Sequence, residues 1–446
     1  MYRLMTIQFL RNKVAVSSIC LLLAVGIISL LVGKQFVNRQ QAAIHETTAH
    51  QKEHIARLVQ YENKEMGLLL YYLKFAHINP TSPLAGLAIG QRDINSSIQA
   101  PTIRGLEGQK YDTDIRNPYQ LMTGHFDLSF VLLYLFPLAI IVLCFNLYSE
   151  EQEQGTWPLV HVQSKSRWKY LLKKLSVPYL FVTGVLLLLY LLAALLLAIP
   201  FGKAFIGFML SNFLYVNFWF AVVLLVISFF KSSAVNAIGL LSIWLLLTLL
   251  LPAAVNNYIT QQYPVPESLS TMVKQRDGYH KKWDISQDST MAMFAKAYPQ
   301  FADSKWTGEG FNWLWYYAMQ HLGDAEAAMD SRLFMQKLMQ RERASATYSY
   351  FIPTLYTQLY NQELAQSSLQ NHLQFLDSTT QFHERLRLYF YPKIFTDAPV
   401  LKEDWGKFTP VYCNISRQAG LPQSGHVGWF ALLLGGWALL RLKNNG

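Results

Sequence analysis

The hydropathy pattern of this chain consists of long apolar segments separated by polar ones. Crossing the hydrocarbon core of a bilayer takes roughly 20 apolar residues in a helix. Six segments are candidates for such spans: residues 14–35, 127–148, 176–199, 205–230, 235–255 and 427–441. The last has the shortest apolar run, although Trp429 and Trp437 are placed to anchor it at the two interfaces. The pattern predicts an all-α polytopic membrane protein with six transmembrane helices.

Basic residues near the ends of these segments predict the orientation. Arg3, Arg11 and Lys13 precede the first span, and five Lys and Arg residues lie in the polar segment 149–175. Short segments rich in Lys and Arg stay in the cytoplasm. We therefore predict that both termini and segment 149–175 are cytoplasmic. Residues 1–13 mix apolar and basic side chains, which indicates a short interfacial helix.

Two long polar segments then fall on the extracytoplasmic side. Residues 36–126 begin with a helical pattern at 40–76 that continues the first span outward, and become irregular from His77 onward. Residues 256–426 are larger and predict a mostly helical extracytoplasmic domain, with long helical stretches at 309–347 and 354–389. The Trp and Tyr residues between 306 and 317 supply enough aromatic bulk for a hydrophobic core.

The composition supports a membrane protein. Hydrophobic residues make up 52% of the chain and charged residues only 15%, against about 25% charged residues in an average soluble domain. The net charge of +10 is scattered around the apolar spans, so positive-inside topology explains it better than nucleic-acid binding. Cys20, Cys144 and Cys413 are too far apart to indicate a disulfide framework or a zinc site.

The polar segment between the second and third spans is first acidic and then basic. Glu150, Glu151 and Glu153 end a short helix, and Gly155 suits a helix C-cap or a bend. Thr156 is placed to cap the next short helix. Trp157 and Leu159 form the apolar side of that helix. Spacing alone leaves two interpretations open, a docking element and a solvated connecting loop.

The order of residues in this segment resembles the ABC-2 class of ABC transporter permeases, whose second and third spans are joined by a segment close to E-x-E-x-G-T-L…L-L…S-R-x-x-x-L-x-x-K. The matching residues here are Glu151, Glu153, Gly155, Thr156, Leu159, Val160, Ser166, Arg167, Leu171 and Lys174. Ser164 and Trp157 depart from the Pro and Leu that are common in the class. Residues 83–90, 117–118, 126–130 and 136–138 resemble one subfamily with enlarged extracytoplasmic regions after the first and fifth spans.

This resemblance implies a permease subunit of an exporter in the bacterial inner membrane. It implies a separate ATP-binding subunit as partner, and a second permease that is either the same chain or a sister chain. In that class the segment is a coupling helix docked on the ATP-binding subunit, which implies coupling roles for Glu150, Glu151, Glu153, Gly155, Thr156, Trp157, Leu159, Arg167 and Lys174. The sequence contains no P-loop motif. We therefore expect no enzymatic activity and no cofactor in this chain, with ATP and magnesium in the partner.

Polar residues inside the predicted spans are costly in lipid. Asn146, Asn212, Asn217 and Asn236 are therefore candidates for a translocation path or a dimer seam, and hydrogen bonding between helices explains them as well. The pattern indicates no particular substrate.

Two other functions compete with transport. The extracytoplasmic domain suits a membrane scaffold that recruits periplasmic proteins. His50, Glu53 and His54 have the H-x-x-E-H spacing of a zinc site. The same stretch also fits a charged, solvated helix, and no further acidic ligand stands out.

Overall fold

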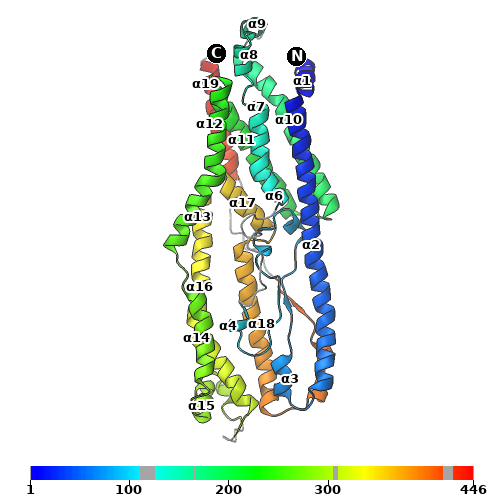
Figure 1. The fold of residues 1–446 in the computed structure, drawn as a ribbon, viewed down its shortest axis with the longest axis vertical. Coiled ribbons are helices and arrows are strands. Elements are labelled where there is room, and N and C mark those ends of the chain that lie inside the picture. Colours follow the sequence, from blue (N-terminus) through cyan, green and yellow to red (C-terminus); the bar gives the residue numbers. More distant parts are fainter. Residues whose placement is uncertain (1, 111–125, 164–165, 305–309, 415–424, 445–446) are drawn as a thin grey trace.

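The computed structural model describes residues 2–110, 126–163, 166–304, 310–414 and 425–444. Within these ranges six helical segments are long and apolar enough to cross a membrane, which confirms the predicted all-α polytopic fold. The molecule is elongated, with a helical bundle at one end and an extramembrane domain at the other (Figure 1). The helix α1, the end of α19 and the helices α8 and α9 all lie at the bundle end (Figure 1).

The bundle consists of helices that alternate in direction. Their bounds are α1 Tyr2–Arg11, α2 Lys13–Tyr61, α6 Leu128–Phe130, α7 Phe136–Cys144, α8 Ser149–Glu153, α9 Trp157–Gln163, α10 Arg167–Leu196, α11 Lys203–Ile227, α12 Ser233–Leu245, α13 Leu251–Gln262 and α19 Gly425–Asn444. The Asn12 side chain caps α2 by accepting from Val14 N and Ala15 N. The helix α2 then runs unbroken for 49 residues to Tyr61. The predicted helical continuation of the first span is therefore present, but it ends before residue 76.

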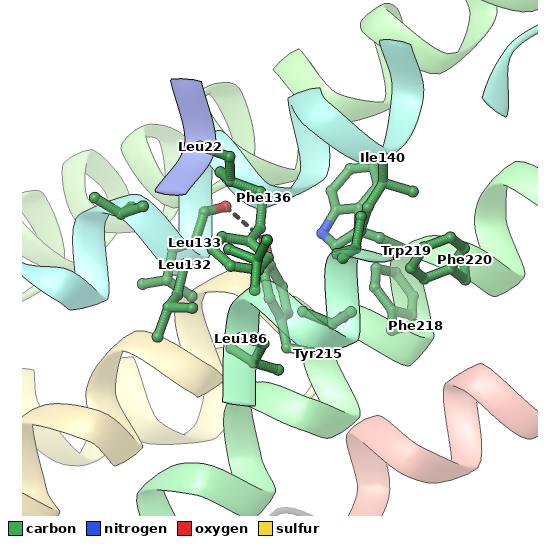
Figure 2. Packing of buried hydrophobic residues seen from close by; sticks show 14 of the residues in the cluster. Leu22, Leu132, Leu133, Phe136, Ile140, Leu186, Tyr215, Phe218, Trp219 and Phe220 are labelled. Atoms are coloured by element: carbon green, nitrogen blue, oxygen red, sulfur yellow. Dashed lines mark hydrogen bonds between the residues drawn. The ribbon is translucent and has the colours of Figure 1, made fainter. Parts of the chain in front are cut away.

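Aromatic residues of α11 form the centre of the bundle. Tyr215 and Trp219 are fully buried and pack against Phe136 of α7 (Figure 2). A wide turn, η3 (Val131–Leu135), precedes Pro137. Because a proline has no N–H, it leaves the carbonyl of Leu133, four residues earlier, without its helical partner. The Tyr215 hydroxyl donates to that carbonyl at 2.9 Å, so the kinked helix and α11 are joined where the proline breaks the ladder. A second wide turn, η4 (Leu246–Leu250), precedes Pro252 in the same way.

Both long polar segments between the spans build one domain. The first contributes α3 (Met66–Tyr72), η1 (Pro83–Gly86), η2 (Gly90–Arg92), α4 (Glu107–Lys110) and the strands β1 (His77–Ile78) and β2 (Ile98–Gln99). The second contributes α14 Glu267–Lys281, α15 Gln287–Ala297, η5 Pro299–Phe301, α16 Trp313–Ser349, α17 Pro353–Leu364, α18 Leu369–Phe395, η6 Val400–Lys402, η7 Trp405–Lys407 and β3 Val411–Tyr412.

One hydrophobic core joins these two segments. Met66, Leu69 and Leu70 of the first segment share a buried cluster with Tyr317 and Phe390 of the second. A small sheet of order β2-β1-β3 also joins them, with β1 antiparallel to β2 and parallel to β3. Residues 36–126 and 256–426 are predicted as separate segments, but their described residues pack as one unit.

The helix α17 connects this domain with the bundle. Asn212 and Asn361 exchange two hydrogen bonds of 3.1 Å through their side-chain amides, and Asn361 also donates to Ser129 Oγ at 3.1 Å. The Tyr215 hydroxyl and Thr354 Oγ1 lie 3.0 Å apart. Tyr215 lies twelve residues after the start of α11, which is about 18 Å along the helix. A part of the segment predicted to be wholly extracytoplasmic therefore returns into the bundle.

Candidate coupling segment

The helices α8 and α9 form a short, sharply bent element between α7 and α10, at the same end of the molecule as α1 and the end of α19 (Figure 1). Gly155 makes the bend, with a φ of +72°. Side chains other than glycine rarely adopt this backbone conformation. A Cβ atom at Gly155 would meet no atom within 4 Å, so backbone conformation alone favours glycine here. The predicted bend at this position is present.

Glu151 fixes this bend to the third span. Its carboxylate accepts hydrogen bonds from Thr156 Oγ1 at 2.6 Å, from the Tyr170 hydroxyl at 3.0 Å and from Lys174 Nζ at 2.9 Å. The side chains of Glu151 and Lys174 are only 14% and 12% exposed. Because water is largely excluded, this ion pair is stronger than an ordinary surface pair. One carboxylate thus joins α8, the start of α9 and the N-terminal part of α10.

Glu153 fixes α8 to a further span. Its two carboxylate oxygens accept from Ser233 N at 2.8 Å and from Ser233 Oγ at 2.9 Å. Ser233 is the first residue of α12, so the carboxylate caps that helix, where a negative charge is favourable. The Ser149 and Ser233 hydroxyls also lie 2.7 Å apart. Among the described residues Glu150 has weaker contacts, since it accepts from Asn146 and Gln154, each at 3.3 Å.

Trp157 packs inside the chain. Its ring contacts Tyr148 at 4.7 Å and Tyr170 at 6.4 Å between centroids, and Tyr148 in turn contacts Phe230 at 4.8 Å. The exposed apolar side chains on described positions of α9 are Pro158 and Val162, and Val162 is 86% exposed. The side chains of Leu159 and Arg167 lie outside those that the structure describes.

The four candidate asparagines make contacts within the chain. Asn212 pairs with Asn361, as described above. Asn217 accepts from the Tyr179 hydroxyl of α10 at 3.1 Å, and Asn236 donates to the Phe145 carbonyl at 3.3 Å. Asn146 donates to Glu150. Asn236 Oδ1 is buried and accepts no hydrogen bond from the described residues. The translocation path or dimer seam stays a prediction.

The H-x-x-E-H stretch lies in α2, where Gln51 is buried and His54 is partly exposed. His50 and Glu53 are about 70% exposed and their side chains lie 4.0 Å apart. His54 Nε2 is instead 3.4 Å from the Tyr72 carbonyl. Among the described residues, no group of three or more His, Cys, Asp or Glu side chains has an arrangement that would hold a metal ion.

Residues 84–255 match a family model described as ABC-2 membrane transporter related. This part of the chain is an ABC-2-type membrane domain. The ABC-2 match begins in η1 and ends in α13, so it contains the bent element and the four spans around it. Residues 269–412, which form most of the extramembrane domain, match a domain family of unknown function, DUF3526. No curated protein and no solved structure matches the chain. Together these matches fit an ABC-2-type permease and confirm the family resemblance of the sequence.

Sequence reasoning missed the partners of Glu151 and Glu153. Tyr170 and Ser233 lie 19 and 80 residues away along the chain, and nothing in the local pattern around either residue indicates the contact. The pairing of Asn361 with Asn212 was not predicted, because Asn361 lies in a segment predicted to be outside the bundle. The position of Ser233 at the start of an apolar span was one indication of its contact with Glu153, since the N-terminus of a helix favours a nearby negative charge.

Proposed function

We propose that this chain is the membrane-spanning subunit of an ATP-driven exporter, and that α8 and α9 couple it to a separate ATP-binding subunit. The ABC-2-type membrane domain and the six apolar helices support a permease. The proposal includes the bacterial inner membrane as location and cytoplasmic positions for α1, α8, α9 and the end of α19. A second permease completes the assembly, and the ATP-binding subunit holds ATP and magnesium.

The observation that carries this proposal is the way in which the bent element is fixed to the spans. It continues from α7, Glu151 fixes it to α10, and Glu153 fixes it to α12. A displacement of α9 by a partner is therefore delivered to three helices together. Rigid contacts of this kind transmit small movements because packed interfaces switch between discrete arrangements.

The intramolecular contacts also separate two roles within the segment. Glu151, Glu153 and Trp157 hold the element in shape, since their side chains already have partners in the chain. The surface left for the ATP-binding subunit includes Gly155, Pro158 and Val162, which are exposed. Pro158 and Val162 are four residues apart, so they lie on the same face of α9. An exposed valine at the tip of the molecule is suited to a groove in a partner.

The test is co-purification of the full chain with its ATP-binding subunit, recognised by mass spectrometry through its P-loop sequence. Val162→Asp places a charge on the proposed docking face and should abolish or strongly reduce retention of that subunit. Val273→Asp is the matched control, because Val273 is 48% exposed on α14 in the extramembrane domain. Equal retention by both variants would contradict docking through α9. Purification of the chain without any ATP-binding subunit would favour the scaffold function instead.

A further inference from the structure

A cavity of about 270 Å³ lies at the junction between the bundle and the extramembrane domain. Three loops surround it: the one that leads into η1, the turn between α10 and α11, and the turn that follows α17. The residues that line it are Ser82, Pro83, Leu84, Ile199, Pro200, Gly202, Lys203, Ala204 and Gln366. This volume is near the lower end of the roughly 300–1,000 Å³ of small-molecule pockets, so it suits a head group rather than a whole lipid.

The cavity lies at the level where the apolar surface of the bundle ends. The helix α10 ends at Leu196 and α11 begins at Lys203, both on the side away from α8 and α9. Leu195 and Phe201 nearby are 71% and 70% exposed, and Ile206 is also exposed, as expected of side chains that face acyl chains. In a bilayer, lipid head groups therefore lie beside the cavity.

Among the residues that line the cavity, Lys203 is the charged one. Lys203 is exposed and, among the described residues, forms no ion pair. Arg92 lies behind the wall and is only 4% exposed. It donates to the carbonyl of Gln366 at 2.8 Å and to that of Pro80 at 3.1 Å. Its other hydrogen bonds go to the carbonyl and side chain of Asn79 and to the hydroxyls of Thr81 and Ser97, so each acceptor is a neutral oxygen.

A buried cation without a counterion is unfavourable, because neutral oxygens only partly replace the hydration that it loses. An anion in the cavity would offset that cost, and Lys203 would meet it directly. The lining also contains hydrogen-bond donors. Ser82 Oγ accepts from Leu84 N at 3.3 Å, which leaves its hydroxyl hydrogen free to donate. Gln366 lines the cavity with its amide side chain half-buried.

We propose that this cavity binds the phosphate group of an anionic membrane lipid, with Lys203 as the charged partner and Ser82 and Gln366 as hydrogen-bond donors. The site lies at the opposite end of the bundle from α8 and α9, and it does not depend on the proposed coupling to ATP hydrolysis. A free phosphate ion shares the chemistry of the head group, and the exposed apolar side chains of α10 and α11 favour the lipid, since they accommodate its acyl chains.

The experiment is native mass spectrometry of the purified full chain in detergent, titrated with phosphatidylglycerol or phosphatidylcholine. We expect preferential retention of phosphatidylglycerol. Lys203→Gln should weaken that retention about tenfold or more, because a hydrogen bond to a charged group is lost. Lys203→Arg should preserve it. Lys64→Gln is the control with the same change in net charge, since Lys64 is exposed in the extramembrane domain far from the bundle.

Each outcome decides the assignment. Selective retention that only Lys203→Gln weakens supports the lipid site. Displacement of phosphatidylglycerol by inorganic phosphate at equal concentration identifies a site for free phosphate and overturns the lipid assignment. Equal retention of both lipids, or no change in Lys203→Gln, overturns the site altogether. Ala204→Leu, which places bulk in the cavity without a change in charge, should weaken retention as well, and its failure to do so would contradict this location.

Discussion

Glu151→Gln is the substitution that bears most directly on the shape of the coupling segment. Glutamine keeps the size of the side chain and removes its charge. The three hydrogen bonds that Glu151 accepts would become weaker, and Lys174, which is largely buried, would lose its ion-pair partner. The bent element should then separate from the N-terminal part of α10.

The size of the effect follows from these contacts. A hydrogen bond to a charged group contributes roughly 1.5–3 kcal/mol, and removing one partner of a buried ion pair costs about 3–5 kcal/mol. Because this pair is slightly exposed and glutamine still accepts hydrogen bonds, we expect about 3 kcal/mol. A free-energy change of that size shifts an equilibrium roughly a hundredfold. The fraction of molecules with α9 released from α10 should increase by that factor.

Amide hydrogen exchange measures this fraction. Exchange of the hydrogen-bonded backbone amides of residues 160–163 should accelerate by up to about a hundredfold in Glu151→Gln, since exchange reports local opening. Glu150→Gln is the matched control. It makes the same chemical change one residue away, at a carboxylate whose partners among the described residues are the neutral side chains of Asn146 and Gln154. It should change exchange less than about threefold. Equal effects of the two variants would refute the assignment of Glu151 as the residue that holds the segment.

Three further predictions concern other parts of the molecule. Gly155→Val should destabilise the bend by about 1–2 kcal/mol because a β-branched residue tolerates positive φ poorly, whereas Gly155→Asn should be nearly neutral. Co-purification of the ATP-binding subunit with each variant checks this prediction. An equal loss of that subunit from both variants would contradict it. Asn361→Ala should lower stability by roughly 2–4 kcal/mol, because it leaves buried polar partners in the bundle without hydrogen bonds. Thermal unfolding measures this loss, with Asn257→Ala on the exposed face of α13 as the control. An equal shift of the melting temperature in the two variants would argue against a stabilising role of the Asn212–Asn361 pair. Burial lowers the pKa of four histidines of the extramembrane domain: to about 4 for His77 and His372, to about 3 for His321, and well below its ordinary value for His383. The unfolded state therefore binds more protons below about pH 6.5, and stability should fall on acidification by up to about 1.4 kcal/mol per pH unit for each histidine. An unchanged melting temperature between pH 7.5 and pH 5 would refute this expectation.

The parts of the fold that were predicted from the sequence depend on local patterns. Apolar runs located the six spans, and the unbroken helical pattern after the first span predicted the outward extension of α2. Gly155 was predicted at a bend because glycine followed by threonine is itself a local pattern. Each of these features is determined by residues that are close together in the chain.

The parts that were not predicted depend on contacts between distant residues. Glu153 and Ser233 are 80 residues apart, and Asn212 and Asn361 are 149 apart. A single polar side chain that pairs across such a distance leaves no periodicity on which to base a prediction. The strands β1, β2 and β3 are two residues long, too short to give the alternation that identifies a strand. The shared core of the segments 36–126 and 256–426 was also not predicted, because its contacts join residues that are far apart in the chain.

The most direct test of the central claim is photo-crosslinking from position 162 in cells. A photoreactive phenylalanine analogue in place of Val162 should form an adduct with a subunit that carries a P-loop motif, because this side chain is 86% exposed at the tip of α9. The same analogue at position 273 should give no such adduct. A crosslink to the ATP-binding subunit from position 162 alone is the result that the coupling account predicts. Its absence in cells that contain the assembled complex, or an equal adduct from position 273, would contradict the account.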